Sequence, residues 1–198
     1  IDAVNLSAEQ QELLKGIPDP LFRQTVRDFC VNQQFRKDYW VKGARTMSAL
    51  EQAETLRAQR IILAQPLGDV SLKVTGSLGE ARLQEAVYAP ILDQLADHKP
   101  KTLGQLEQAL KQTEAGKAIS FAQIQQAAMV LGATGALLAV QDEAAIQKAK
   151  KRTDKLNTHL MTKARSNNEL SHLASPVTGG GITVPRFHQL FLLARAQG

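Results

Sequence analysis

The sequence predicts a mainly helical α+β fold. Apolar residues recur with helical spacing over most of the chain, often behind a helix-capping signal. Short runs rich in β-branched residues, at 61–66 and 70–76, are typical of strands. The composition then changes near residue 85. These observations divide the chain into an α+β part, residues 1–84, and a second, largely helical part, residues 85–198.

Within the first part, helices and strands are expected to alternate and to form one small sheet. The sequence predicts helices at 7–16, 20–34 and 48–60. Capping boxes open the first and third of these helices, with Ser7 and Gln10 in one and Ser48 and Glu51 in the other. The strands that the sequence predicts lie at 35–41, 61–66, 70–76 and 79–84.

The second part has the outline of a winged-helix domain, because three helices precede a short strand. The helices are expected at 85–97, 101–113 and 120–135, and the strand follows at 136–140. A long basic amphipathic segment comes next. A glycine-rich loop, residues 173–185, then joins this segment to a last apolar helix that Thr183 and Pro185 open.

Composition sets the broad class of the protein. The 198 residues carry 43% hydrophobic side chains, enough for a core, and a net charge of +5. The single cysteine, Cys30, cannot form an internal disulfide, which favours a reducing cytoplasm. No apolar run is long enough to cross a membrane. None of the four histidines has a histidine or cysteine three or four residues away, so no metal signature is present.

Residues 19–45, "DPLFRQTVRDFCVNQQFRKDYWVKGAR", resemble a domain of known type. It is the regulatory domain that follows the catalytic domain of bacterial class I methyltransferases, which carries the run F-x-N-R-x-F-R-x-D-x-x-V-R-G. Gln33 and Lys42 stand where that run has arginine. The positions that match it are Asn32, Phe35, Arg36, Asp38, Val41 and Gly43. The later stretches "LASPVTGGGI" and "LFLLA" are similar to the winged-helix domain of the protein-lysine methyltransferase branch.

This resemblance implies a non-catalytic role for the chain in regulation, dimerisation or substrate positioning. It implies a catalytic domain upstream of Ile1, which would hold S-adenosylmethionine. It also implies a homodimer and a protein substrate. No catalytic, cofactor-binding or metal-binding residue is expected in the chain itself, and its effect on methyl transfer would come from holding domains or substrate in place.

The aromatic stretch at 22–48 is the first candidate contact surface. Aromatic and basic residues alternate there, as in many interfaces. Tyr39 and Trp40 are neighbours on the expected strand and should point to opposite faces, one into the core and one toward a partner. The residues that we expect to make the contact are Phe35, Arg36, Tyr39, Trp40 and Arg45.

The basic run at 144–165 is the second candidate. Its cations are expected to form a solvated helix face, while Ile146, Leu156, Leu160 and Met161 cover a core. An acidic partner surface is the alternative. The basic face is defined by Lys148, Lys151, Arg152 and Lys155.

Two other classes of function fit the sequence less well. A winged helix can bind DNA through its third helix, which offers Gln123, Gln125 and Gln126 here. Residues 118–147 contain no Lys or Arg, however, and this argues against nucleic acid. A self-sufficient enzyme is disfavoured because no set of acid, base, nucleophile or ligand can be assembled. Gly179, Gly180 and Gly181 fit a flexible turn between two helices better than a loop that binds the methyl donor.

Overall fold

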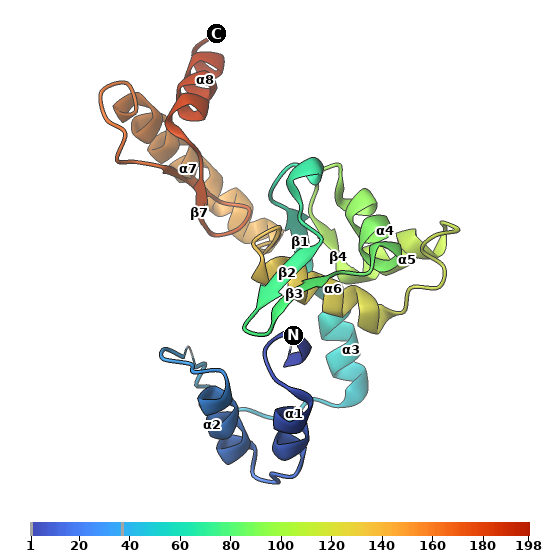
Figure 1. The fold of residues 1–198 in the computed structure, drawn as a ribbon. Coiled ribbons are helices and arrows are strands. Elements are labelled where there is room, and N and C mark those ends of the chain that lie inside the picture. Colours follow the sequence, from blue (N-terminus) through green and yellow to red (C-terminus); the bar gives the residue numbers. More distant parts are fainter. Residues whose placement is uncertain (1, 37) are drawn as a thin grey trace.

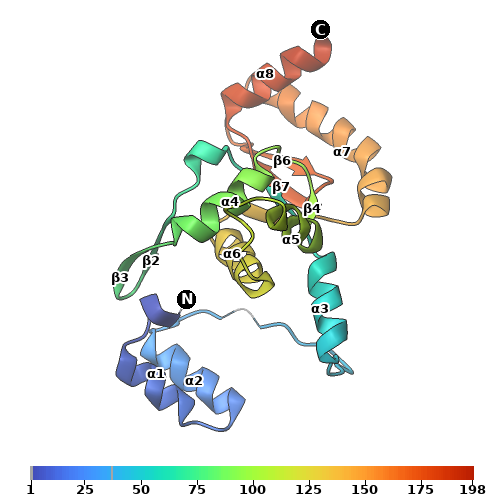
Figure 2. The ribbon, with the colours of Figure 1, turned by 90° about the vertical axis from the view of Figure 1, so that its right-hand side faces the viewer.

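The computed structural model describes residues 2–36 and 38–198. Helix accounts for 51% of it and strand for 13%, so the expected α+β class is confirmed. Figure 1 shows three packed parts in chain order: an N-terminal helix pair, a central part around a small sheet, and a C-terminal part built on one long helix. The N-terminal pair and the last helix lie at opposite ends of the molecule in both views (Figures 1 and 2).

The N-terminal part begins with a short 3-10 turn and continues into two packed helices. These elements are η1 (Asp2–Val4), α1 (Ala8–Lys15) and α2 (Pro20–Cys30). The capping box of Ser7 and Gln10 is present, and Asp19 accepts a hydrogen bond from the Phe22 amide at the start of α2. Leu6 and Leu14 are buried. Local sequence signals therefore set where both helices begin.

The central sheet has three antiparallel strands, in the order β4-β1-β5. They are β1 (Arg60–Leu63), β4 (Lys101–Thr102) and β5 (Leu137–Ala139). Ile61 lies opposite both Lys101 and Ala139, which fixes the register on the two sides. Ile61 and Leu63 point into the core, so β1 is buried on one face and flanked on both edges.

Three helices pack on this sheet and supply most of the core. They are α4 (Glu85–Leu95), α5 (Leu103–Lys111) and α6 (Phe121–Ala133). The middle strand of the sheet, β1, precedes these helices in the chain, and β5 follows them. The sheet thus joins residues on both sides of the expected division at residue 84. That division and the winged-helix character of the second part stay predictions.

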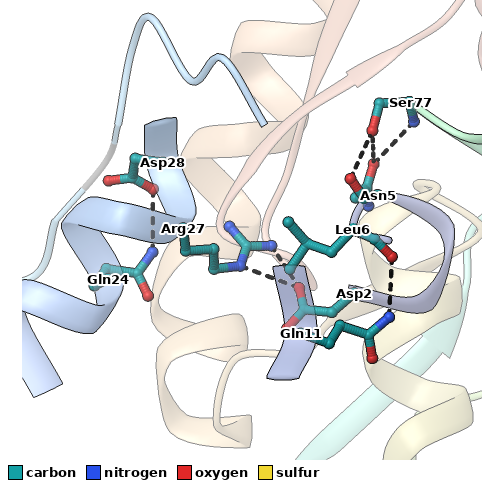
Figure 3. Close-up of polar contacts among 8 residues, drawn as sticks. All are labelled: Asp2, Asn5, Leu6, Gln11, Gln24, Arg27, Asp28 and Ser77. Atoms are coloured by element: carbon teal, nitrogen blue, oxygen red, sulfur yellow. Dashed lines mark hydrogen bonds and ion pairs between the residues drawn. The ribbon is translucent and has the colours of Figure 1, made fainter. Parts of the chain in front are cut away.

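A hairpin holds the N-terminal part against the centre. It consists of β2 (Lys73–Gly76) and β3 (Gly79–Arg82), and it follows a short 3-10 turn, η2 (Leu67–Asp69). The Leu78 amide donates to the Val4 carbonyl at 3.0 Å, and the Ser77 amide donates to the Asn5 side chain at 3.1 Å. A side chain at Gly76 would collide with Val4, so this approach requires glycine. Asp2 belongs to η1, the same turn as Val4. Arg27 of α2 forms an ion pair with Asp2 at 2.7 Å (Figure 3).

Helix α3 (Ala49–Ala58) is fixed to α5 at its C-terminal end. The Arg57 guanidinium lies 2.8 Å from a Glu107 carboxylate oxygen and 4.1 Å from the centre of the Phe121 ring. A Cβ on Gly104 would stand 3.3 Å from the Arg57 backbone oxygen, so the two helices approach closely. The hydrogen bonds from Arg57 hold the pKa of Glu107 below its usual value.

The C-terminal part pairs a long helix with a hairpin and a last helix. Its elements are α7 (Glu143–Lys163), β6 (His172–Ser175), β7 (Gly180–Thr183) and α8 (Arg186–Gln197). They share a small core of Met161, Leu173 and Leu193. The expected glycine-rich loop between two helices is wrong, because residues 172–183 form a β-hairpin. Gly179 has a φ of +73° and makes the reversal that lets the two strands pair.

Replacing Glu107 by Gln should lower the free energy of unfolding by up to about 1 kcal/mol at pH 7, because the ion pairs with Arg57 and Lys111 are lost. The folded-state pKa of Glu107 is lowered, so the carboxylate stabilises the fold above its unfolded pKa, about 4.3, and that stability is lost as the pH falls through the folded value. Urea unfolding from pH 7 to pH 3 should show the difference from wild type shrinking. Exposed Glu54→Gln on α3 is the control. A difference in unfolding free energy between wild type and Glu107→Gln that stays constant with pH would show that the Glu107 carboxylate does not stabilise the fold.

Candidate functional site

Helix α2 and the segment after it expose an unusual amount of apolar surface. No residue of α2 is buried, although the sequence places Phe22, Val26 and Phe29 on one side of this helix. Large exposed apolar patches on a protein mark sites of interaction. We call the following exposed residues the aromatic surface: Leu21, Phe22, Phe29, Phe35, Tyr39, Trp40 and Val41.

The expected strand at 35–41 is wrong. The described residues of this segment have no regular secondary structure and pair with no other strand. Aromatic and β-branched residues favour a strand only where a neighbouring strand can pair with it. The prediction that one ring fills the core is also wrong, because Tyr39 is 93% exposed and Trp40 is 89% exposed. Both rings are therefore available to a partner.

Asn32 directs the chain out of α2. Its φ is +52°, in the left-handed region that asparagine tolerates better than most residues. The Gln33 amide donates to the Asp28 carbonyl, and the Asn32 amide donates to the Phe29 carbonyl. These two bonds form a Schellman motif, which ends the helix sharply. Asn32, one of the positions that match the methyltransferase run, thus has a structural role.

Two arginines tie the ends of the segment to the neighbouring helices. Arg36 lies 2.7 Å from Asp28 of α2 and 2.9 Å from Asp38, and the hydrogen bonds to these carboxylates, that to Asp28 first, raise its pKa. Arg45 lies 3.3 Å from Glu51 of α3. Both arginines were expected to contact a partner, and that prediction stays open. The sequence alone did not identify Asp28 as a partner of Arg36. Its only distinguishing feature in the sequence is that it is an acidic residue within a basic stretch.

Tyr39 and Trp40 thus lie in the sequence between Arg36, which pairs with α2, and Arg45, which pairs with α3. These ion pairs leave both rings exposed. The geometry suits protein–protein contact, in which aromatic side chains often supply most of the binding energy.

The four cations expected to form a basic face all lie on α7. Lys148 stands three and four residues before Lys151 and Arg152, and Lys155 stands four and three residues after them, so the four share one side of the helix, and all are exposed. Their role as a contact surface stays a prediction. No described residue forms an ion pair with any of them. Leu156 was expected to cover the core but is 48% exposed.

Ile146 and Met161 of the same helix are buried, which agrees with their expected place in a core. The arrangement is that of an amphipathic helix with one solvated face. It defines no ligand site.

The described residues offer no metal centre. No three of their His, Cys, Asp and Glu side chains come together in a way that could bind a metal ion. Among the same residues, no helix has both the length and the apolarity needed to cross a bilayer. Cys30 is partly exposed at the end of α2.

Comparison with known proteins supports part of the resemblance seen in the sequence. Residues 1–42 match the family described as "Predicted methyltransferase regulatory domain". This confirms the regulatory-domain resemblance of the N-terminal segment, which includes all of the aromatic surface. The resemblance of the later part to the winged-helix domain of the protein-lysine methyltransferase branch stays a prediction.

A relative covers nearly the whole chain. It is "Uncharacterized protein sll1526" of Synechocystis sp. (strain ATCC 27184 / PCC 6803 / Kazusa), 38% identical over 195 residues. The alignment takes in 98% of this chain but only 38% of the relative, so sll1526 has a large additional portion. No solved structure matches the chain.

Trp40 is the only tryptophan, so its fluorescence reports directly on the aromatic surface. Because the ring is 89% exposed, iodide and acrylamide should quench the folded chain almost as efficiently as the chain in 6 M guanidinium. Stern–Volmer constants measured in both states test this. Free N-acetyltryptophanamide in each solvent is the control. Quenching of the folded chain that is several-fold weaker than that of the unfolded chain would show that the ring is buried.

Proposed function

We propose that this chain is a non-catalytic regulatory region of a bacterial methyltransferase that uses S-adenosylmethionine. The observation that carries the proposal is the coincidence of two features within residues 1–42: the match to the methyltransferase regulatory domain, and the exposed aromatic surface anchored by Arg36. A regulatory region acts through contact with another part of the protein, and this is the surface best suited to such contact.

The occupant that we infer for the aromatic surface is the catalytic domain of the same protein. The length of sll1526 outside the alignment supports this, because it leaves room for a catalytic domain in addition to the region shared with this chain. Docking would orient the catalytic cleft or form one wall of it. The methyl acceptor would be a protein, and the resemblance of residues 173–182 and 190–194 implies that lysine is the side chain modified.

Intact sll1526 and a variant that lacks the 195 aligned residues offer the direct test. Both should bind S-adenosylmethionine in isothermal titration, since the cofactor site is proposed to lie outside the shared region. The 198-residue chain alone should give no heat. Transfer of a labelled methyl group to protein should fall at least tenfold in the deletion variant. Cofactor binding by the 198-residue chain, or full activity without the shared region, would overturn the proposal.

Tyr39→Ala combined with Trp40→Ala tests the aromatic surface within the protein that contains this chain and its catalytic domain. Loss of two exposed rings should leave the fold and the cofactor affinity unchanged, and it should change the rate of methyl transfer about tenfold or more. Phe187→Ala is the control, because Phe187 is also an exposed aromatic residue and lies outside the aromatic surface, on α8. If the double variant and the control behave alike, the surface has no part in regulation. If the double variant changes only the oligomeric state, the occupant is a second copy and not the catalytic domain.

A further inference from the structure

The β6–β7 hairpin has one closed edge and one open edge. The Val184 amide donates to the Ser171 carbonyl, so these two residues form a hydrogen-bonded pair of the ladder. Hydrogen-bonded and non-hydrogen-bonded pairs alternate in an antiparallel ladder, so Leu173 and Ile182 are the next hydrogen-bonded pair, and Ala174 and Gly181 are a non-hydrogen-bonded pair. The backbone groups of Ala174 therefore point out of the ribbon on one side. Asn157 of α7 binds both of them, at 2.8 Å each, and so closes the edge of β6 at this residue.

On the other side, the backbone groups of Gly181 and Thr183 point out of the ribbon in the same way. No described residue is a hydrogen-bond partner of either amide. Free strand edges in proteins are commonly protected by charged side chains or proline within the strand. Strand β7, Gly-Gly-Ile-Thr, carries neither, whereas β3 carries Glu80 and Arg82.

The glycines of β7 have no explanation inside the molecule. A Cβ at Gly180 would meet open space, and a Cβ at Gly181 would meet only ordinary contacts at 3.7 Å or more. Neither residue has a positive φ. Glycine in a strand is destabilising relative to alanine. Glycine within a strand often marks a place where another backbone approaches closely, and that account fits Gly180 and Gly181.

A hollow of about 500 Å³ lies beside these glycines. Helix α7 contributes Ala145, Ala149 and Thr153 to one wall, and residues 172–176 with 179–181 form the other. Asp, Glu, Lys and Arg are all missing from the described residues that line it. Gly180 and Gly181 have no side chains that could separate the hollow from the open edge of β7.

We propose that β7 binds an extended peptide segment of a partner protein, which adds to the hairpin as a third strand. The outward amides and carbonyls of Gly181 and Thr183 would supply the main-chain hydrogen bonds. An uncharged side chain of the peptide would reach across the glycines into the hollow. In this mode of recognition main-chain bonds give affinity, and pockets for side chains give specificity.

A partner segment fits this site better than a second copy of the chain. Strand β7 of a second copy offers only Gly-Gly-Ile-Thr, so any side chain that it placed at the hollow would be a short β-branched one. A foreign strand can place a longer side chain there. Peptide binding at β7 does not depend on the proposed role in methyl transfer, because it uses no residue of the aromatic surface.

The test begins with phage-displayed random 12-residue peptides selected on the immobilised 198-residue chain. The strongest are synthesised and titrated by fluorescence anisotropy against wild type and three variants. Gly181→Pro removes one outward amide without removing a bond of the hairpin ladder, and it should weaken binding about tenfold. Gly181→Val fills the entrance to the hollow and should also weaken binding, while leaving the chain as stable as wild type or more so. Trp40→Ala is the control and should bind like wild type.

Thermal unfolding identifies any variant that no longer folds, and Gly181→Val keeps the test decisive if Gly181→Pro does not fold. Amide chemical shifts of Gly181, Ile182 and Thr183 should move on addition of peptide. The proposal is overturned if no peptide is selected. It is also overturned if selected peptides bind the Gly181 variants as tightly as wild type, or if Trp40→Ala is the variant that abolishes binding.

Discussion

The placement of β1 between β4 and β5 is the constraint on which the rest of the structure depends. Leu63 is 2% exposed, and the core around β1 draws on all three helices of the central part. A single residue, Gln59, separates the end of α3 from the start of β1. The position of α3 is therefore set by the strand and reinforced by Arg57 with Glu107.

This constraint also determines where the aromatic surface lies. Residues 31–48 join α2 to α3 (Figure 2). Helix α2 is held through η1 to the β2–β3 hairpin (Figure 3), and α3 is held to α5. The segment runs between two supported helices and is tied to each by an arginine. Tyr39 and Trp40 contribute little to the stability of the chain because they remain in water. Burial of one large apolar side chain against a partner would contribute about 1.5–3 kcal/mol.

The features that the sequence predicted well are local ones. Ser7 and Ser48 each cap a helix as expected, since the partner of a capping side chain lies three residues away. The return strand at 79–84 is present as β3 for a similar reason, because a short turn joins it to β2. The fold class follows from such elements.

The features that the sequence did not predict depend on distant contacts. The composition of residues 35–41 suits a strand, but no strand lies beside them to pair with. The hairpin at 172–183 forms because Asn157 and the core of Met161 and Leu193 lie against it, and a glycine-rich sequence alone does not indicate them. In the candidate site, the aromatic residues were identified from composition, whereas their full exposure and the role of Asp28 became visible only in the folded chain.

The central claim is that the aromatic surface is exposed in this region alone and covered in the longer protein. Hydrogen–deuterium exchange, followed by mass spectrometry, measures this most directly. Intact sll1526 would be compared with its isolated 195-residue aligned region. The account predicts slower exchange in the intact protein for the segment that aligns with residues 21–48, with little change in the segments that align with α4, α5 and α6. Equal exchange of the 21–48 segment in both proteins would contradict it.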